Sequence, residues 1–431
     1  MIGFVTLFLG VFFGIREVEV APAADVARVE LRLDDAVVAT LEKPPWKANV
    51  DFGANPLPRL LVAVARAGDG HELGRVEQWV NRPTPMASAS LALVPGEPPA
   101  VRLSWEAVTG AKPETLTVTC DGQPLDVSNP ARIPLPPTAF TGTKLVRASL
   151  EFPGLVRAGA ELLLGTGVRD SADTALTAVL VTVPKGELPP PAALRGFFEA
   201  DGKELEVVAW EKGPAEVHVV AERSARIHLL DGDGGAAFWG AESRYYTALD
   251  MKLVTKLPKG SRFRVMVPVP VESNSERTRY RVFRGSPRFG AEEAGVLRVV
   301  WAIGAPAAKD GPPLVREAVA ASGLALSGDV TRRVVVLLLG PQPKDTSALG
   351  DEGLRGFLSA LEVPYRVLNL VRARASGWGE AKEAFTIRLL ESSIFQIGEE
   401  LERQRIVWVT GRHRPGSVKL TAKASNVALA R

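Results

Sequence analysis

Two aspartates separated by a single glycine follow an apolar segment in the stretch RIHLLDGDGGAAFWG, residues 226–240. Asp231 and Asp233 would supply carboxylate oxygens, the ligands that magnesium and calcium prefer in proteins. A stretch rich in glycine and aspartate is also typical of a plain turn, because both residues tolerate the backbone angles that turns require. Two interpretations are therefore open, a divalent-cation site and an acidic turn that leads into a helix.

A calcium loop of the EF-hand type is a further metal interpretation. Asp231 and Asp233 would take positions one and three of that loop, and Glu242 falls at position twelve. Position six requires a glycine for its sharp turn but holds Ala236. The segment before the loop is also strand-like rather than helical. The spacing therefore argues against an EF-hand.

The elements that would position this loop alternate between strand and helix beyond residue 215. An unbroken apolar run such as RRVVVLLLG is typical of a central strand that is covered on both faces. This alternation predicts a doubly wound α/β sheet with helices on both faces. Strands are expected over 217–230, 263–271, 280–284, 332–340, 365–371 and 405–410, and helices over 245–257, 313–322, 351–361 and 381–403.

The front half of the chain has the period of β-strands. Apolar and polar residues alternate over 29–33, which predicts a half-buried strand. Residues 116–120 repeat the pattern at an offset of roughly 85 residues, near the ~100 residues of an immunoglobulin-like sandwich. This repeat predicts two tandem β-sandwiches. Cys120, the single cysteine, is expected to be a small buried hydrophobic residue rather than a nucleophile.

These patterns predict a multidomain chain in which all-β sandwiches precede an α/β domain. Residues 1–83 form the first sandwich and 84–185 the second, and the proline-rich stretch 186–195 is a linker. The α/β domain takes residues 196–415. Residues 416–431 are expected to be a basic tail, which is solvated, bound to a partner, or added as a strand to the sheet edge of a neighbouring molecule.

The N-terminal stretch MIGFVTLFLGVFFGI allows two interpretations. It is apolar enough for a signal peptide, but no basic residue precedes the apolar run. It is also shorter than the ~20 residues of a membrane-spanning helix, so no integral span is expected. We favour two strands, over residues 4–9 and 16–20.

Composition excludes several classes of function. A formal net charge of +3 is too small to argue for nucleic acid. One cysteine cannot build a cysteine-based metal site, and the four histidines lack ligand spacing. The sequence also lacks the phosphate loop, the H-E-x-x-H motif and the G-x-S-x-G elbow. We therefore expect no catalytic residues and no enzymatic activity.

Two parts of the chain resemble known families. The first part resembles bacterial immunoglobulin-like domains in the order of its motifs, which are residues 29–35, Pro44-Pro45-Trp46 and residues 51–53. The segments RIHLLDGDGGAA, PPLVREAVAAS, TRRVVVLLLGPQPKDTS and RQRIVWVTGRHRP resemble a von Willebrand factor type A domain. The whole arrangement is similar to bacterial "VWFA-related" proteins, which implies a setting outside the cytoplasm or in the cell envelope.

The resemblance also implies where a metal would bind. In such domains the loop after the first strand reads D-x-S-x-S and holds magnesium or manganese with oxygens from other loops. Asp231 matches the aspartate, Asp233 stands at the first serine position, and Asp345 follows the central strand. Gly235 stands at the second serine position and offers no side chain. The site is therefore expected to be degenerate, with no cofactor needed.

The function expected from these features is non-enzymatic protein–protein interaction or scaffolding, with aromatics such as Trp239 and Trp378 exposed for contact. One alternative is a magnesium-dependent adhesion module that uses Asp231 and Asp233. Another is an accessory subunit that docks on a larger enzyme or secretion complex.

Overall fold

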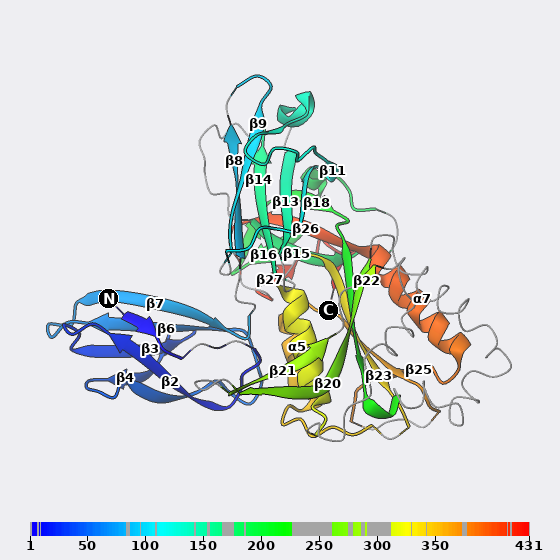
Figure 1. Ribbon diagram of the computed structural model, residues 1–431. Helices are drawn as coiled ribbons and strands as arrows, with labels where there is room; N and C mark the ends of the chain where they lie inside the picture. The colour runs from blue at the N-terminus through cyan, green and yellow to red at the C-terminus, as the bar shows by residue number, and fades with distance from the viewer. Residues whose placement is uncertain are drawn as a thin grey trace.

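The computed structural model of the chain describes residues 2–6, 8, 10–82, 87–94, 96–107, 110–141, 144–152, 156–165, 176–184, 187–225, 261–274, 279–285, 289–290, 312–328, 330–341, 343–372, 377–411, 413 and 416–430. Figure 1 shows four bodies: a β-sandwich at the left, a second at the top, a third in the middle, and an α/β body below it and to the right. Among these residues no helix is long and apolar enough to cross a lipid bilayer.

The first sandwich contains β1 (Ile2–Phe4), β2 (Ile15–Pro22), β3 (Arg28–Leu33), β4 (Ala36–Leu41), β5 (Lys47–Asp51), β6 (Arg59–Arg66) and β7 (Glu72–Val80). The strand orders are β1-β2-β5 in one sheet and β4-β3-β6-β7 in the other. Val18 on β2 and Phe52, directly after β5, lie in one buried apolar cluster with Leu31 on β3 and Leu61 on β6. The alternation over 29–33 thus places its apolar residues in a sandwich core, as predicted.

The apolar start of the chain is part of this sandwich. β1 pairs antiparallel with β2, and Ile2 and Phe8 are buried in the core. The Phe8 ring meets Phe12 and Phe52 edge-on, with ring centroids 5.0 and 5.1 Å apart. The strand predicted over 16–20 is confirmed by β2, whereas the one predicted over 4–9 is misplaced, because β1 covers residues 2–4.

The second sandwich contains β8 (Ala87–Val94), β9 (Ala100–Ala107), β10 (Thr115–Cys120), β11 (Gln123–Pro124), β12 (Ile133–Pro134), the short 3-10 helix η1 (Pro137–Phe140), β13 (Lys144–Phe152) and β14 (Val156–Leu164). Its sheets have the orders β11-β10-β13-β14 and β12-β9-β8. Cys120 is buried in the core between them, and burial raises the pKa of its thiol. Its expected role as a small apolar residue is confirmed.

A third sandwich, not expected from the sequence, is built from two distant segments. It contains β15 (Leu176–Thr182), η3 (Pro191–Leu194), β16 (Phe198–Ala200), β17 (Lys203–Leu205) and β18 (Val207–Glu211), followed much later by β26 (Gln404–Thr410), β27 (Val418–Leu420) and β28 (Ala428–Leu429). The sheet orders are β18-β26-β15-β28 and β17-β16-β27. The α/β body is therefore an insertion between β18 and β26.

This topology corrects the predicted boundaries. The supposed linker 186–195 is not a free connector, because Leu188 and Leu194 are buried in the third sandwich. The supposed tail 416–431 is not a free extension either, since Val418 and Val427 are buried in the same core. The composition of both segments is that of loops, but each carries the few apolar residues that the sandwich buries.

The α/β body contains β19 (Ala215–Ala221), β20 (Arg262–Asn274), β21 (Arg279–Gly285), β22 (Phe289–Gly290), α5 (Val315–Ser327), β23 (Arg332–Leu339), α6 (Asp351–Ala360), β24 (Tyr365–Asn369), β25 (Ala381–Glu383) and α7 (Ile387–Arg403). The sheet order is β21-β20-β19-β23-β24-β25, and β22 pairs with β20. The run from β20 to β25 is parallel, and β21 and β22 are antiparallel to β20. The predicted fold class, β-sandwiches and an α/β sheet, is confirmed.

The central strand β23 is buried on both faces, as its apolar sequence predicts. Val334 and Val336 belong to the apolar cluster of α7, whereas Val335 and Leu337 belong to that of α5 and α6. Val11 and Phe13 from the first sandwich also pack against the α5 and α6 cluster. This contact joins the first sandwich to the α/β body.

The last predicted helix and strand are corrected. Residues 381–403 are not one helix: β25 comes first, and α7 begins at Ile387, where the Thr386 hydroxyl accepts a hydrogen bond from the Leu389 backbone N–H at 3.2 Å. β26 does not close the parallel sheet. It pairs antiparallel with β15 and β18 in the third sandwich, a pairing that local sequence cannot reveal.

Two glycine substitutions test the packing at the end of β23. A Cβ at Gly340 would lie 2.1 Å from the Ala225 backbone nitrogen, which cannot move aside as a side chain could. We expect Gly340→Ala to lower the free energy of unfolding by about 3 kcal/mol. The control is Gly356→Ala within α6, where a Cβ meets nothing within 4 Å. It should raise stability by up to about 1 kcal/mol. Urea denaturation of both variants checks this, and equal effects would contradict it.

Candidate functional site

The carboxyl ends of β19 and β23 mark the point at which the strand order of the sheet reverses, where doubly wound proteins commonly bind ligands. Glu222 follows β19 and is 1% exposed. Its Oε2 accepts hydrogen bonds from the Ser224 backbone N–H at 2.8 Å and the Ser224 hydroxyl at 2.5 Å. Its Oε1 accepts one from the Lys344 backbone N–H at 3.3 Å. This carboxylate therefore joins the two loops at the crevice.

Asp345 lies in the loop after β23, and both of its oxygens bond to donors of the chain. Oδ1 accepts from the Val315 backbone N–H at 2.8 Å and from the Ser347 hydroxyl at 2.7 Å. Oδ2 accepts from Arg316 Nη1 at 2.7 Å. Val315 is the first residue of α5, so the aspartate stabilises the positive end of this helix.

The remaining predicted metal ligands, Asp231 and Asp233, lie outside the described residues. Within the described ranges, which omit 226–260, no group of three or more histidine, cysteine, aspartate or glutamate side chains is placed to hold a metal ion. The metal hypothesis therefore stays a prediction.

The carboxylate that follows the first strand of the α/β sheet is one that sequence reasoning missed. The apolar run over 217–230 suggests a strand that ends just before Asp231. The strand in fact ends at Ala221, so Glu222 takes the place that the prediction gave to Asp231. The polar group Glu222-Arg223-Ser224, directly after seven residues of strand, was the available signal.

Metal titration separates the two interpretations of the acidic loop. We expect no saturable heat that depends on Asp231 when Mg²⁺, Mn²⁺ or Ca²⁺ is titrated into the full chain, because Glu222 and Asp345 already bond to protein donors. Isothermal titration of the wild type and of Asp231→Ala checks this. The full chain is needed, since a fragment from residue 196 lacks β15. Saturable binding abolished by the substitution would establish a metal site.

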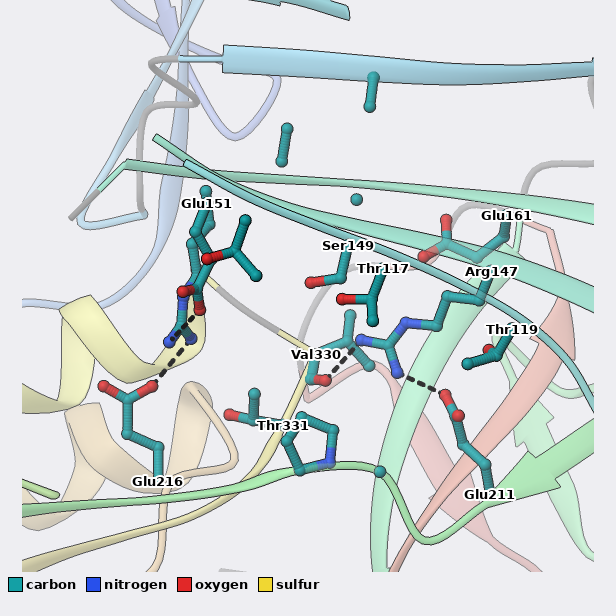
Figure 2. A pocket seen from close by; sticks show the side chains of 18 of the residues that line it. Thr117, Thr119, Arg147, Ser149, Glu151, Glu161, Glu211, Glu216, Val330 and Thr331 are labelled. Carbon is teal, nitrogen blue, oxygen red and sulfur yellow. Dashed lines mark hydrogen bonds and ion pairs between the residues drawn. The ribbon is translucent and has the colours of Figure 1, made fainter. Parts of the chain in front are cut away.

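A cleft of about 780 Å³ opens at the opposite, amino end of the sheet. Three bodies line it: the outer face of the second sandwich, the end of β18 in the third, and the first residues of β19 and β20. Figure 2 shows Thr117, Thr119, Arg147 and Ser149 above the cleft and Thr331 below it. Crevices between domains are common binding sites, and roughly 300–1,000 Å³ is usual for them.

Strand register arranges the sandwich side of this cleft as three rows. The pairings are Thr119 with Arg147 and Glu161, Thr117 with Ser149 and Gly159, and Thr115 with Glu151 and Arg157. The outer rows carry charges, whereas the middle row has two hydroxyls and a glycine. Because directly paired residues project to the same face, the middle row forms a shallow trough between two charged ridges.

Ion pairs connect both ridges to the other bodies. Arg147 donates to Glu211 on β18 at 2.5 Å and to the Val330 carbonyl at 2.7 Å. Arg157 donates to Glu216 on β19 at 2.8 Å. Figure 2 shows these bridges at the two sides of the cleft, with Ser149 and Thr117 between them. The trough is thus bounded at both sides by these bridges, and Val330 lies next to its middle row (Figure 2).

Buried polar groups without partners face this space. The Thr331 hydroxyl has no hydrogen-bond partner among the described residues, and Thr331 is 6% exposed. The Arg147 Nε–H is likewise buried and unsatisfied within the described structure. Burial raises the pKa of the Glu161 carboxyl, the charge of Arg147 lowers it in part, and that of Glu211 raises it further. A ligand in the cleft would find unpaired donors and acceptors.

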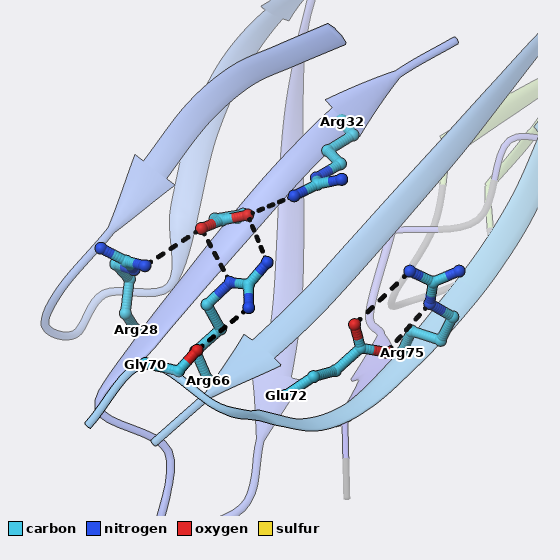
Figure 3. A network of polar contacts seen from close by, with 7 residues as sticks. Arg28, Arg32, Arg66, Gly70, Glu72 and Arg75 are labelled. Atoms are coloured by element: carbon cyan, nitrogen blue, oxygen red, sulfur yellow. Dashed lines mark hydrogen bonds and ion pairs between the residues drawn. The ribbon is translucent and has the colours of Figure 1, made fainter. Parts of the chain in front are cut away.

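A contrasting carboxylate lies on the outer face of the first sandwich. Glu30 accepts hydrogen bonds from Arg32 and Arg66 at 2.8 Å and from Arg28 at 3.1 Å. Figure 3 shows the three arginines converging, with Arg75 bound separately to Glu72. The hydrogen bonds from Arg32 and then Arg66 lower the pKa of the Glu30 carboxyl. This carboxylate is fully engaged, unlike that of Glu161.

The two glutamates should affect stability with opposite signs. Glu161 keeps its proton to higher pH in the folded state, so folding loses stability as the pH rises from its ordinary pKa of 4.5 through the raised value. Glu161→Gln should therefore be more stable than the wild type at about pH 7 and equal to it at about pH 3.

Glu30 stabilises the fold above its ordinary pKa, and this stabilisation is lost as the pH falls through the lowered value. Glu30→Gln should be less stable at about pH 7, with the difference shrinking towards pH 3. Urea unfolding at both pH values measures these effects, and shifts of the same sign at pH 7 would refute the assignment.

The predicted exposed tryptophans need correction. Trp378 is 5% exposed and packs in the α5 and α6 cluster, with the Arg316 guanidinium 4.3 Å above its ring. It is not available to a partner, because the Asp345–Arg316 pair fixes a cation over one face of the ring. Trp239 lies outside the described residues.

No protein-family model matches the sequence. No curated protein matches it either. Among solved structures, it is similar to a von Willebrand factor type A protein from Catenulispora acidiphila, with 9% identity over 58% of this chain and 73% of that chain, at a TM-score of 0.29.

Two other solved structures are also similar to parts of the chain. The PilB minor pilin from Streptococcus sanguinis is 7% identical over 80% of this chain and 84% of that chain, at a TM-score of 0.25. Fibronectin(III)-like modules of CbhA from Clostridium thermocellum are 13% identical over 41% of this chain and 100% of that chain, at a TM-score of 0.16. Likenesses this distant say nothing about function.

Proposed function

We propose that this chain is a non-enzymatic protein-binding scaffold whose first sandwich contacts the partner. The observation that carries this proposal is the exposed apolar surface of that sandwich, above all at its edge strand β4. In the described part of the chain, nine large hydrophobic side chains are exposed, and five of them belong to this one body: Val5, Ile15, Val37, Val38 and Leu57. Apolar surface concentrated in this way favours a contact with another protein.

β4 presents the most suitable surface. It is an edge strand whose sequence, AVVATL, contains no charge. Edge strands usually carry charged residues that prevent pairing with other chains. A bulge in its pairing with β3 falls at Val38, so that Val37 and Val38 are 54% and 39% exposed in succession. A partner strand could pack on these valines and use the open edge beyond them.

The rest of the chain supports the scaffold interpretation. Val11 and Phe13 anchor the first sandwich on the α/β body, and ion pairs of Arg147 and Arg157 join the second sandwich to the third and to the α/β sheet. A binding edge mounted on coupled bodies loses little orientational freedom when a partner binds. The proposal includes an extracytoplasmic setting, which rests on the sequence resemblance, and accommodates an accessory subunit of a larger complex.

Substitution of one valine tests this function. Tagged full-length chain, cross-linked in its native cells and purified, should retain a stoichiometric protein partner. Val37→Lys should reduce that retention by about tenfold or more, because a charge at the centre of an apolar contact is desolvated without a partner.

Val5→Lys is the matched control, since Val5 is 53% exposed and directly follows β1, a strand of the sheet that does not contain β4. It should retain the partner at the wild-type level. Loss of the partner in both variants, or retention in both, would contradict a binding role for the β4 edge.

A further inference from the structure

The cleft between the second sandwich and the amino end of the α/β sheet has the lining of a binding site rather than of a closed domain contact. Among the described residues, its middle row of Thr117, Ser149 and Gly159 makes no hydrogen bond or ion pair to the facing bodies, whereas the rows on both sides do. Side-chain hydroxyls, rather than strand edges, line this trough, because β13 is paired on both sides. The side-chain groups that a ligand can contact are therefore hydroxyls, carboxylates and guanidinium groups.

The charges of the residues that line the cleft indicate the net charge of the ligand. Four basic side chains line the cleft, Arg147, Arg157, Arg262 and Lys212, and so do four acidic ones, Glu151, Glu161, Glu211 and Glu216. The sum is zero, and the arginines are paired with carboxylates. A strongly charged ligand would have to break these pairs, of which Arg147–Glu211 and Arg157–Glu216 are largely buried. A neutral ligand would leave them intact.

The polar groups of the lining that lack partners indicate which functional groups the ligand carries. The Thr331 hydroxyl and the Arg147 Nε–H are buried and unsatisfied among the described residues, and leaving such groups unpaired is costly. Figure 2 shows Thr117 and Ser149 on one side of the cleft and Thr331 on the other, with Val330 between them. A ligand hydroxyl can both donate and accept, so one kind of group would satisfy all of these.

The remaining lining is small and aliphatic. Val330 and Pro214 contribute short apolar surfaces, and no aromatic side chain is among the described residues that line the cleft. Such surfaces suit the C–H faces of a sugar ring better than a nucleobase, which stacks on aromatic rings. The volume of about 780 Å³ leaves room for several linked rings.

We propose that this cleft binds a neutral oligosaccharide, seated on the trough of Thr117, Ser149 and Gly159 and hydrogen-bonded to Thr331. The two ion-pair bridges limit the ligand at both sides. This site is independent of the protein contact at β4, because the two surfaces lie on different sandwiches.

Gly159 offers a direct test of the trough. A Cβ there would meet its nearest neighbours, the Ala148 carbonyl oxygen and Glu161 Oε1, at 3.6 Å, so a small side chain fits. The full-length chain is screened on an array of neutral, acidic and sulfated glycans, and the best neutral oligosaccharide is titrated by calorimetry. We expect Gly159→Leu to weaken binding by about tenfold or more by filling the trough, and Gly159→Ala to stay within about twofold.

Thr331→Val is the second variant, since it removes the unpaired hydroxyl and keeps the shape of the side chain. It should weaken binding by about two- to tenfold, the usual range for one hydrogen bond, without loss of thermal stability. If Gly159→Leu fails to fold, this variant decides the outcome. Lack of binding to every neutral glycan, a preference for acidic or sulfated glycans or for a peptide, or unchanged affinity in both Gly159→Leu and Thr331→Val would overturn the proposal.

Discussion

The placement of β26 between β15 and β18 is the constraint on which the rest of the architecture depends. After β18 the chain leaves the third sandwich and forms the whole α/β body. It then returns to the third sandwich, where β26 pairs between β15 and β18, two strands that lie some 200 residues earlier in the sequence. Both ends of the α/β body are thereby anchored in one core. Trp408 on β26 shows the consequence, because its indole donates to Glu211 at 3.2 Å while the Arg147 guanidinium lies 5.5 Å from its ring.

Through these contacts the third sandwich also sets the position of the second. Leu145 packs against Ile406 and Trp408, just beside the bridge between Arg147 and Glu211. Apolar burial supplies the favourable free energy of this junction. The buried ion pairs cost desolvation and contribute little net stability, but they fix the distance at which the two surfaces face each other. A polar cleft remains beside this apolar junction because the charged side chains of Arg147 and Arg157 bridge the two surfaces there.

The two ends of the α/β sheet have consequently different chemistry. At the carboxyl end, where ligands of doubly wound sheets usually bind, Glu222 and Asp345 are occupied by backbone and side-chain donors of neighbouring loops. At the amino end, Glu216 and Arg262 reach across to another domain and help to enclose the Thr331 hydroxyl, which has no partner among the described residues. The insertion of the sheet between the strands of a sandwich gives the amino end a partner surface that an isolated α/β domain lacks.

The pattern of apolar and polar residues was sufficient to predict the elements whose burial leaves a period in the sequence. The alternation over 29–33, the apolar run of β23 and the extent of α6 were all predictable, because burial on one face or on both leaves a period in the chain. The break between β25 and α7 was not, since the apolar residues on both sides continue one helical pattern. Asp345 was identified as a residue of the sheet's ligand edge, but its partners on α5 were not.

Only the tertiary structure decided the third sandwich and the cleft. β15 and β26 carry ordinary strand sequences, and nothing in either specifies a partner more than 200 residues away. Likewise the threonines at 115, 117 and 119 are visible as an alternating row, but strand register alone brings Ser149 and Gly159 beside them. The sequence by itself determined which residues avoid water and with what period. Which of those surfaces meet is a property of long-range pairing, whose free energy depends on the whole chain at once.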